Sequence, residues 1–263
     1  MAADLRGTTM NAAIKPIDAI LFDLGETLIH WGSIDRQRVF LRAAHRTYDL
    51  WAQRQQRMPD FHRYYMHQWF ALHWGHLKQV VLRREMNAMR YLERACRKLW
   101  LMAPDPFFRE LAWQWYQPLA EIATIEPGTH DLLESLSRRG YRLAIVSNTF
   151  VPGAVLDRHL ASLDLLPFFP QRIYSCDIGY RKPDRRIFSH ALQRVGVSAD
   201  RAVFVGDLYP TDVRGAQRAG LHAVWKRPAH DQPTRRRPAS TPAITQLQEL
   251  PTAIDRLITG SAA

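Results

Sequence analysis

Four short segments of the chain carry side chains suited to chemistry: a lone carboxylate, a hydroxyl, an amine and a pair of carboxylates. In chain order these groups are Asp23, Ser147, Lys182, Asp207 and Asp212. A carboxylate can attack phosphorus or carbon and form an acyl intermediate that water then resolves. Paired carboxylates are the hard, negatively charged oxygen ligands that suit Mg²⁺. The residue types therefore point to a nucleophilic carboxylate working beside a divalent metal.

Apolar runs immediately before three of these groups predict the strands that position them. Residues 19–22 are continuously apolar and end at Asp23, as expected of a buried parallel strand. Similar runs at 143–146, within the predicted strand 142–146, and at 202–205 precede the hydroxyl and the carboxylate pair. In open α/β sheets, ligands bind at the carboxyl ends of the strands. We therefore expect these groups to meet at one edge of a sheet.

Predicted strands and helices alternate from residue 129 onward. Helices are expected over 129–138, 152–161, 185–195 and 212–219, and strands over 142–146, 171–175, 202–205 and 222–225. An edge strand at 243–244 and a helix over 246–257 complete the pattern. This alternation predicts an α/β fold with a Rossmann-like parallel sheet and right-handed crossovers.

Residues 31–125 have a different texture. Helix formers dominate there, Gly is nearly absent, and apolar residues recur at three- and four-residue spacing, with breaks at Pro59 and Pro104. We predict about four helices and no strand in this stretch. Residues 1–30 and 126–263 would then form the α/β core, interrupted after its first strand by an all-helical domain.

The order and context of the four segments resemble the four motifs of the haloacid dehalogenase-like (HAD) hydrolases. The matching stretches are residues 22–28, 146–149, 181–184 and 206–212, and the resemblance extends over about 17–257. Members of this superfamily form covalent aspartyl intermediates, most often with phosphorylated substrates. Many carry a mobile helical cap, and the resemblance implies a cap of the C1 type at 31–125.

The resemblance implies a nucleophile and a metal site. Asp23 would attack the substrate and bind Mg²⁺ through its other oxygen, together with the main-chain carbonyl of Gly25. Asp207 would be a direct ligand, and Asp212 a second ligand through water or a partner that orients Lys182. Taken alone, Asp23 fits an ordinary turn residue and Asp212 fits a helix N-cap.

The resemblance also implies a phosphate site. Ser147 and Asn148, with neighbouring main-chain N–H groups, would hold phosphate oxygens, where such donors favour charge that grows in the transition state. Lys182 would neutralise both the nucleophile and the phosphate. Thr27 would help to position the nucleophile and the turn that follows it.

One position departs from the family pattern. The phosphatases of the family have a second Asp two residues after the nucleophile, which protonates the leaving oxygen and later activates water, and Gly25 stands there instead. General acid–base catalysis is worth roughly 10²–10⁴-fold in rate. Glu26, the next residue, is a candidate substitute acid, and the alternative is a solvated loop residue.

Three functions follow from these features. The first is an Mg²⁺-dependent phosphomonoesterase that acts on a small phosphorylated metabolite through an aspartyl-phosphate. The second is a binding module with little or no turnover, suggested by Gly25. The third is a 2-haloacid dehalogenase-like hydrolase, since those relatives also lack the second Asp, although the retained Asp207 argues against it.

Composition excludes several other classes. The chain of 263 residues is 46% hydrophobic, which suits one large domain or a domain with an insertion. It has no apolar run of about 18 residues, so no membrane association is expected. Residues 1–15 lack an apolar signal core and the chain has only 2 cysteines, so we expect a cytoplasmic protein.

The formal net charge of +11 favours anionic ligands, although an Arg-rich composition explains it equally well. The basic, Pro-rich segment 226–242 is predicted to be a surface loop. It has no interleaved aromatic residues or nucleic-acid motif, so a nucleic-acid partner is not expected. No feature of the sequence specifies an oligomeric state.

Overall fold

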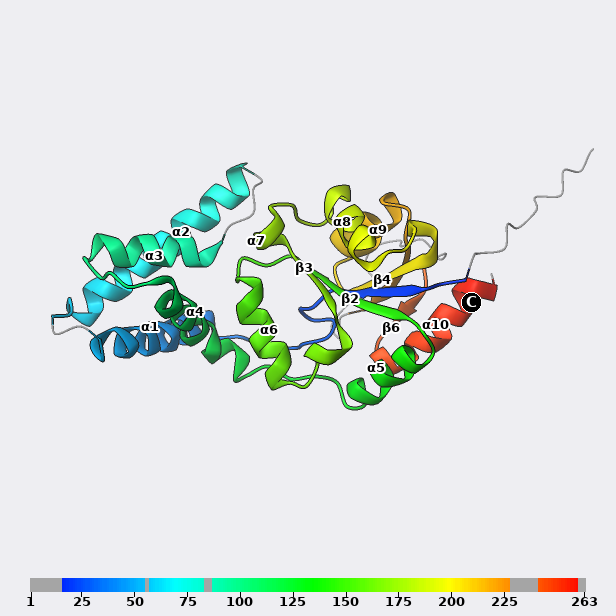
Figure 1. The fold of residues 1–263 in the computed structure, drawn as a ribbon, viewed down its shortest axis with the longest axis horizontal. Coiled ribbons are helices and arrows are strands. Elements are labelled where there is room, and N and C mark those ends of the chain that lie inside the picture. The colour runs from blue at the N-terminus through cyan, green and yellow to red at the C-terminus, as the bar shows by residue number, and fades with distance from the viewer. Residues whose placement is uncertain (1–15, 55–56, 83–86, 228–240, 260–263) are drawn as a thin grey trace, which may run out of the picture.

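A computed structural model describes residues 16–54, 57–82, 87–227 and 241–259, and Figure 1 shows its ribbon. Residues 1–15, on which the cytoplasmic expectation partly rests, lie outside this range. So does most of the basic segment 226–242. Among the described residues, no helix has both the length and the apolar character needed to cross a membrane. Neither Cys96 nor Cys176 forms a disulfide bond.

Six strands form a single sheet in the order β3-β2-β1-β4-β5-β6, and every neighbouring pair is parallel. The strands are β1 (Ala19–Phe22), β2 (Arg142–Ser147), β3 (Gln171–Tyr174), β4 (Ala202–Gly206), β5 (His222–Lys226) and β6 (Ala243–Ile244). All six start where the sequence predicted, and each end lies within one residue of its prediction. The predicted α/β class is confirmed.

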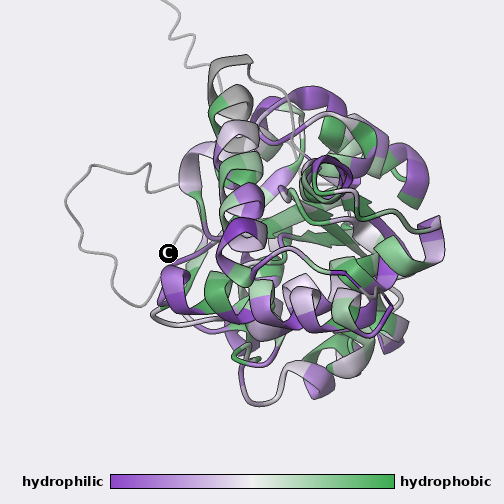
Figure 2. Cartoon of the chain, turned by 90° about the vertical axis from the view of Figure 1, so that its left-hand side faces the viewer, coloured by the Kyte–Doolittle hydropathy of each residue, from purple (hydrophilic) through white to green (hydrophobic). Residues whose placement is uncertain are grey.

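Helices cover both faces of the sheet. One face packs against α5 (Thr129–Arg138), α6 (Gly153–Ser162) and α10 (Leu250–Thr259), and the other against α8 (Arg185–Val195) and α9 (Arg214–Arg218). Side chains of a strand alternate between faces, so β1 gives Ile20 and Phe22 to the first core and Leu21 to the second. Burial on both faces explains the unbroken apolar run. Figure 2 shows the hydrophobic colouring of the central strands.

Four helices follow β1 and form a helical unit at one end of the sheet (Figure 1). They are α1 (Arg36–Ala52), α2 (Phe61–Leu82), α3 (Ala88–Lys98) and α4 (Asp105–Ala120). Trp51, Tyr64 and Leu111 are buried and pack together inside the unit. The exact domain boundaries at residues 30 and 126 stay a prediction.

The two chain segments that join the helical unit to the sheet lie side by side. The main-chain N–H of His30 donates to Thr124 O, and that of Thr124 donates to His30 O, both at 2.8 Å. Further contacts cross from the unit to the sheet domain: Ala88 N donates to Phe150 O at 2.9 Å, and Tyr116 on α4 contacts His159 on α6. An ion pair between Arg158 on α6 and Glu110 on α4, at 2.7 Å, also joins the unit to the sheet domain.

His159 is expected to make folding depend on pH. The side chain is 1% exposed, and its Nδ1 lies 2.9 Å from the Tyr116 hydroxyl. Burial lowers the pKa of His159 to about 4. The unfolded chain, with a His pKa near ~6.5, therefore binds the proton more readily. Stability from neutral His159 is fully present above pH ~6.5 and is lost as the pH falls toward about 4.

This linkage predicts a loss of about 2 kcal/mol between pH 7 and pH 5 from His159 alone. Urea unfolding of the native chain and of His159→Gln at both pH values measures it, because the difference between the two losses isolates this group. An equal loss in His159→Gln would show that His159 does not carry the effect.

Candidate active site

Three neighbouring strands bring the predicted side chains to one edge of the sheet. Asp23 follows β1, Ser147 ends β2 and Asp207 follows β4, and β1 lies between the other two strands. The register places Phe22 beside Val205, and Asp23 N donates to Val205 O at 2.8 Å. All three residues are at most 8% exposed. The prediction that these groups meet at the carboxyl ends of the strands is consistent with this arrangement.

Lys182 connects two of the carboxylates. Its Nζ lies 2.8 Å from Asp23 Oδ1 and 2.9 Å from Asp212 Oδ1, and the side chain is 1% exposed. Burial by itself would lower the pKa of the ammonium, but the two carboxylates outweigh it and raise that pKa. Lys182 is therefore a fixed positive charge between Asp23 and Asp212.

Asp23, Asp207 and Asp212 form a compact cluster, with one carboxylate oxygen from each lying within 4.8 Å of the others. Burial, helped by the charges of Asp23 and Asp212, raises the pKa of Asp207 to about 7. Burial also raises the pKa of Asp23, even though Lys182 opposes this. Three carboxylates with one ammonium leave an excess of negative charge on hard oxygen donors. That donor set fits a divalent cation such as Mg²⁺.

Asp212 lies in a π-helical turn, Tyr209–Val213, that precedes α9. The sequence predicted a regular helix beginning at residue 212, and this was wrong because Asp212 bonds back to the start of the turn. Its Oδ2 accepts from Leu208 N at 2.9 Å, while its Oδ1 pairs with Lys182. A Cβ at Gly206 would lie 2.6 Å from the Asp212 side chain, so only glycine permits this approach. Asp212 is therefore bonded to Lys182 and to Leu208 N and does not cap α9, while its role as a second metal ligand or as an orienting partner of Lys182 stays a prediction.

Asn148 holds the main chain of Lys182 from both sides. Its Nδ2 donates to Lys182 O at 2.9 Å, and its Oδ1 accepts from Lys182 N at 2.7 Å. Asp184 then caps α8 by accepting from Arg186 N at 2.9 Å. The sequence placed Asn148 on the substrate, and that role stays a prediction beside this positioning one. Ser147 stays a predicted phosphate contact.

The loop after β2 depends on a residue that the sequence did not single out. Ser175 is fully buried; its Oγ accepts from Thr149 N at 2.8 Å and donates to Thr149 O at 3.1 Å. No local motif signals this contact, because the two residues are 26 positions apart. Ser175 thereby fixes the backbone that follows Ser147.

The turn after Asp23 holds Glu26 by contacts within the turn. Glu26 has a positive φ of 53°, and its carboxylate lies 3.4 Å from His30 Nδ1 and accepts from Trp31 N at 3.3 Å. Thr27 is fully buried beside it. The main-chain bonds of the turn use the carbonyls of Leu24 and Ile29, not that of Gly25. The metal role of Gly25, the positioning role of Thr27 and the acid role of Glu26 stay predictions.

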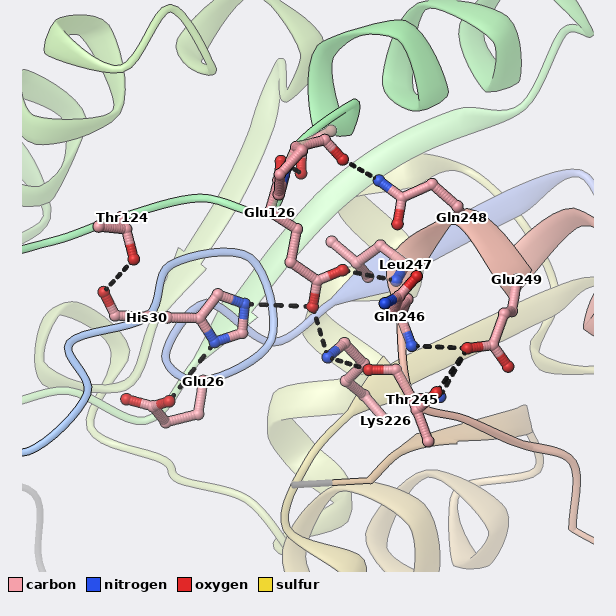
Figure 3. Close-up of polar contacts among 12 residues, drawn as sticks. Glu26, His30, Thr124, Glu126, Lys226, Thr245, Gln246, Leu247, Gln248 and Glu249 are labelled. Carbon is pink, nitrogen blue, oxygen red and sulfur yellow. Dashed lines mark hydrogen bonds and ion pairs between the residues drawn. The ribbon is translucent and has the colours of Figure 1, made fainter. Parts of the chain in front are cut away.

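His30 extends this turn into a polar network (Figure 3). Its Nε2 lies 3.4 Å from Glu126 Oε1, and the same oxygen pairs with Lys226 Nζ at 2.6 Å. Lys226 also donates to Thr245 O at 2.8 Å, and Glu126 accepts from Leu247 N at 2.7 Å. The network ties the turn after β1 to the linker after α4 and to the C-terminal segment.

The carboxylate cluster predicts a response of stability to magnesium. A ligand that binds only the folded state raises the free energy of unfolding by about 2.7 kcal/mol at 100-fold over its Kd. We expect Mg²⁺ to raise the unfolding temperature and Asp207→Asn to abolish that rise. Without Mg²⁺ at pH 8, the unfolding temperature of Asp207→Asn should equal or exceed that of the native chain, because the substitution removes a buried negative charge.

The matched control for this experiment is Asp255→Asn. Asp255 lies on the surface of α10, where it pairs with Arg139. This variant should keep the native Mg²⁺ response, as measured by thermal unfolding with a Mg²⁺ titration. An Asp207→Asn variant that responds to Mg²⁺ like the native chain would contradict the site.

The chain folds into a parallel sheet that a helical unit interrupts after its first strand, and carboxylates and a buried lysine lie at one edge of this sheet. These features define the class of the protein. A family model described as haloacid dehalogenase-like hydrolase matches residues 17–220, and the chain belongs to this family of hydrolases. The match includes every residue from Asp23 to Asp212 in the cluster described above.

Several curated relatives are phosphatases by name. The chain is 36% identical over 100 residues to a glyceraldehyde 3-phosphate phosphatase from Methanothermobacter thermautotrophicus, which covers 37% of this chain and 42% of that protein. It is 32% identical over 127 residues to a pyrimidine 5'-nucleotidase from Streptococcus pneumoniae, covering 48% of this chain and 52% of that protein. A phosphoserine phosphatase from Thermus thermophilus is 36% identical over 117 residues, covering 44% and 46%. The matches thus span about half the length of these relatives.

Solved structures share the fold over nearly the whole chain. A HAD phosphatase from Thermococcus onnurineus superposes with a TM-score of 0.57 at 23% identity, covering 94% of this chain and all of that one. A 2-haloacid dehalogenase from Pseudomonas syringae superposes with a TM-score of 0.55 at 25% identity, covering 91% and 99%. Both support the α/β fold with its helical insertion.

Proposed function

We propose that the protein is an Mg²⁺-dependent phosphomonoesterase that hydrolyses a small phosphorylated metabolite through a phosphoryl intermediate on Asp23. The observation that carries this proposal is the lysine shared by Asp23 and Asp212 beside Asp207. An anionic substrate needs such positive charge near an anionic nucleophile. The phosphatases among the relatives support the same reaction.

In this reaction a carboxylate oxygen of Asp23 bonds to phosphorus, and the bond from phosphorus to the leaving oxygen breaks. Water then attacks phosphorus, which releases inorganic phosphate and restores the Asp23 carboxylate. Lys182 favours the ionised form of Asp23 and offsets the charge of the incoming phosphate. Ser147 is proposed to donate its hydroxyl proton to a phosphate oxygen.

The groups proposed to hold Mg²⁺ are the carboxylates of Asp23, Asp207 and Asp212 and the main-chain carbonyl of Gly25. When bound, Mg²⁺ supplies positive charge to the phosphoryl group. Asn148 also bonds to the main chain of Lys182, and Asp212 also pairs with its ammonium, so both help to hold Lys182 in place. The helical unit at 31–125 is proposed to serve as a cap that excludes water and selects the substrate.

A second candidate, a carbon–halogen hydrolase, is favoured by two observations. The chain is 25% identical to the 2-haloacid dehalogenase from Pseudomonas syringae over 91% of its length, and Gly25 removes the second acidic residue. The carboxylate cluster favours the phosphatase, because attack on carbon does not need a divalent cation to offset phosphate charge.

The test is hydrolysis of p-nitrophenyl phosphate and a panel of phosphomonoesters, with Mg²⁺ and with a chelator, beside halide release from 2-chloropropionate. Release of phosphate that requires Mg²⁺ is expected. Halide release without phosphate release would establish the second candidate in its place. Mg²⁺ binding without either product would leave a binding module.

A further inference from the structure

The surroundings of Asp23 offer little to protonate a leaving group. We infer that the site selects phosphoryl donors whose leaving group departs as a stable anion, such as acyl phosphates and aryl phosphates, over alkyl phosphomonoesters. The inference rests on the proposed phosphatase function and specifies the substrate class of that same site.

An aromatic ring fills the space beside Gly25. A Cβ built at Gly25 would lie 3.1 Å from Cζ3 and 3.7 Å from Cη2 of Trp31, and the first distance is shorter than an ordinary van der Waals contact. Trp31 packs against the core that contains Phe22 and Leu28. A side chain at position 25 would therefore have to displace the Trp31 indole. The position two residues after Asp23 holds no acid, and an acid placed there would press against this ring.

The acidic residues described around Asp23 are already engaged. The Glu26 carboxylate is directed to His30 and to Trp31 N, at 3.4 and 3.3 Å. Asp212 uses one oxygen on Lys182 and the other on Leu208 N. Asp207 belongs to the proposed metal cluster. Among these described groups, none is placed as a free proton donor to a departing oxygen.

The ammonium of Lys182 is engaged in the same way. Its Nζ is buried between Asp23 and Asp212, at 2.8 and 2.9 Å from their carboxylate oxygens. Giving up a proton there would leave two buried carboxylates without their cation, which is costly. Lys182 therefore offsets charge and keeps its proton.

The chemistry of the first step sets the selection. When Asp23 takes the phosphoryl group, the electron pair of the breaking P–O bond stays on the leaving oxygen. A carboxylate or a phenolate accepts that pair without a proton, whereas an alkoxide requires one as the bond breaks. General acid catalysis is worth roughly 10²–10⁴-fold, so the preference for acidic leaving groups should be of that order.

The experiment uses the full chain with Mg²⁺ and a series of phosphate donors: acetyl phosphate, substituted phenyl phosphates and simple alkyl phosphates. Log kcat/KM is plotted against the pKa of the leaving group. We expect a steep negative slope across the phenyl series, and alkyl phosphates to be slower than acetyl phosphate by about 10²-fold or more.

Variants test the role of Trp31. In Gly25→Asp combined with Trp31→Ala, the new carboxyl group has room. The kcat/KM for alkyl phosphates should therefore rise at least about tenfold, and the slope of log kcat/KM against leaving-group pKa should flatten. Gly25→Asp alone should gain less, because the indole remains at 3.1 Å from the new Cβ. Trp31→Ala alone is the matched control and should keep the steep slope.

Failure of this inference differs from failure of the proposed function. A flat slope, with alkyl and aryl phosphates hydrolysed at similar kcat/KM, would overturn the leaving-group selection and keep the phosphatase. No phosphate release from any donor, including acetyl phosphate, and no phosphoryl label on Asp23 would overturn both. The slope is measured on the native chain, so the inference is tested even where a variant fails to fold.

Discussion

Replacing Lys182 with methionine is expected to lower the free energy of unfolding by about 3–5 kcal/mol at neutral pH. Methionine keeps the length and apolar stem of the side chain but removes the charge between Asp23 and Asp212. Both carboxylates are buried, and each lies within 2.9 Å of the ammonium. Breaking a buried ion pair from one side costs this much because the remaining charges lose their partner.

Urea unfolding of Lys182→Met at pH 7 measures this loss, and Lys98→Met is the matched control. Lys98 is exposed in the last turn of α3, so its replacement should change stability by less than about 0.5 kcal/mol. A loss below about 1 kcal/mol in Lys182→Met would mean that the carboxylates do not depend on this lysine. Added Mg²⁺ should recover part of the loss, since a divalent cation also offsets these charges.

Replacing Asp23 with asparagine is expected to lower phosphatase turnover by about 10³-fold or more, because the amide cannot form the covalent intermediate. The fold should survive, since asparagine has nearly the same shape and its amide oxygen can still accept from Lys182 Nζ, which lies 2.8 Å from Asp23 Oδ1. Turnover of p-nitrophenyl phosphate, together with circular dichroism and thermal unfolding, separates lost chemistry from lost structure.

Asp18→Asn is the matched control for this variant. Asp18 lies just before β1, at the opposite end of the strand from Asp23, and its Oδ1 accepts from Arg201 at 2.7 Å. We expect phosphatase turnover by Asp18→Asn to stay near the native value. Turnover in Asp23→Asn above a tenth of the native rate would exclude Asp23 as the nucleophile.

The strands could be predicted because their signal is local. A parallel strand buried on both faces has to be apolar throughout, and residues 19–22 satisfy that condition without reference to the rest of the chain. The carboxyl-end rule then indicated where Asp23 and Asp207 would lie. The sequence could therefore place those residues of the candidate site that directly follow a strand.

Contacts between distant segments could not be predicted in this way. The π-helical turn at Tyr209–Val213 depends on the Asp212–Lys182 pair and on the close approach at Gly206. Local propensity alone makes Asp212 a helix cap, and only the family resemblance suggested Lys182 as its partner. Asn148 matched a substrate-binding motif, yet its amide is bonded to the main chain of Lys182.

Trp31 was missed for a related reason. Its ring reaches Gly25 only because the intervening turn folds back, with Glu26 at a positive φ and Glu26 N donating to Ile29 O at 2.7 Å. In the sequence, Trp31 is simply an aromatic residue at the start of a helical stretch. A glycine that replaces an expected acid is therefore best examined together with whatever fills the space it leaves.

The paired bonds between His30 and Thr124 mark the place where we expect the helical unit to pivot. Both covalent connections of the helical unit pass through these two residues, and reciprocal hydrogen bonds join them into a two-stranded strap. We therefore expect any movement of the unit relative to the sheet domain to turn about this strap. Such a swing would separate Ala88 from Phe150 and Tyr116 from His159 while the strap stays intact. His30 also contacts Glu26, so the pivot lies next to the turn that follows Asp23.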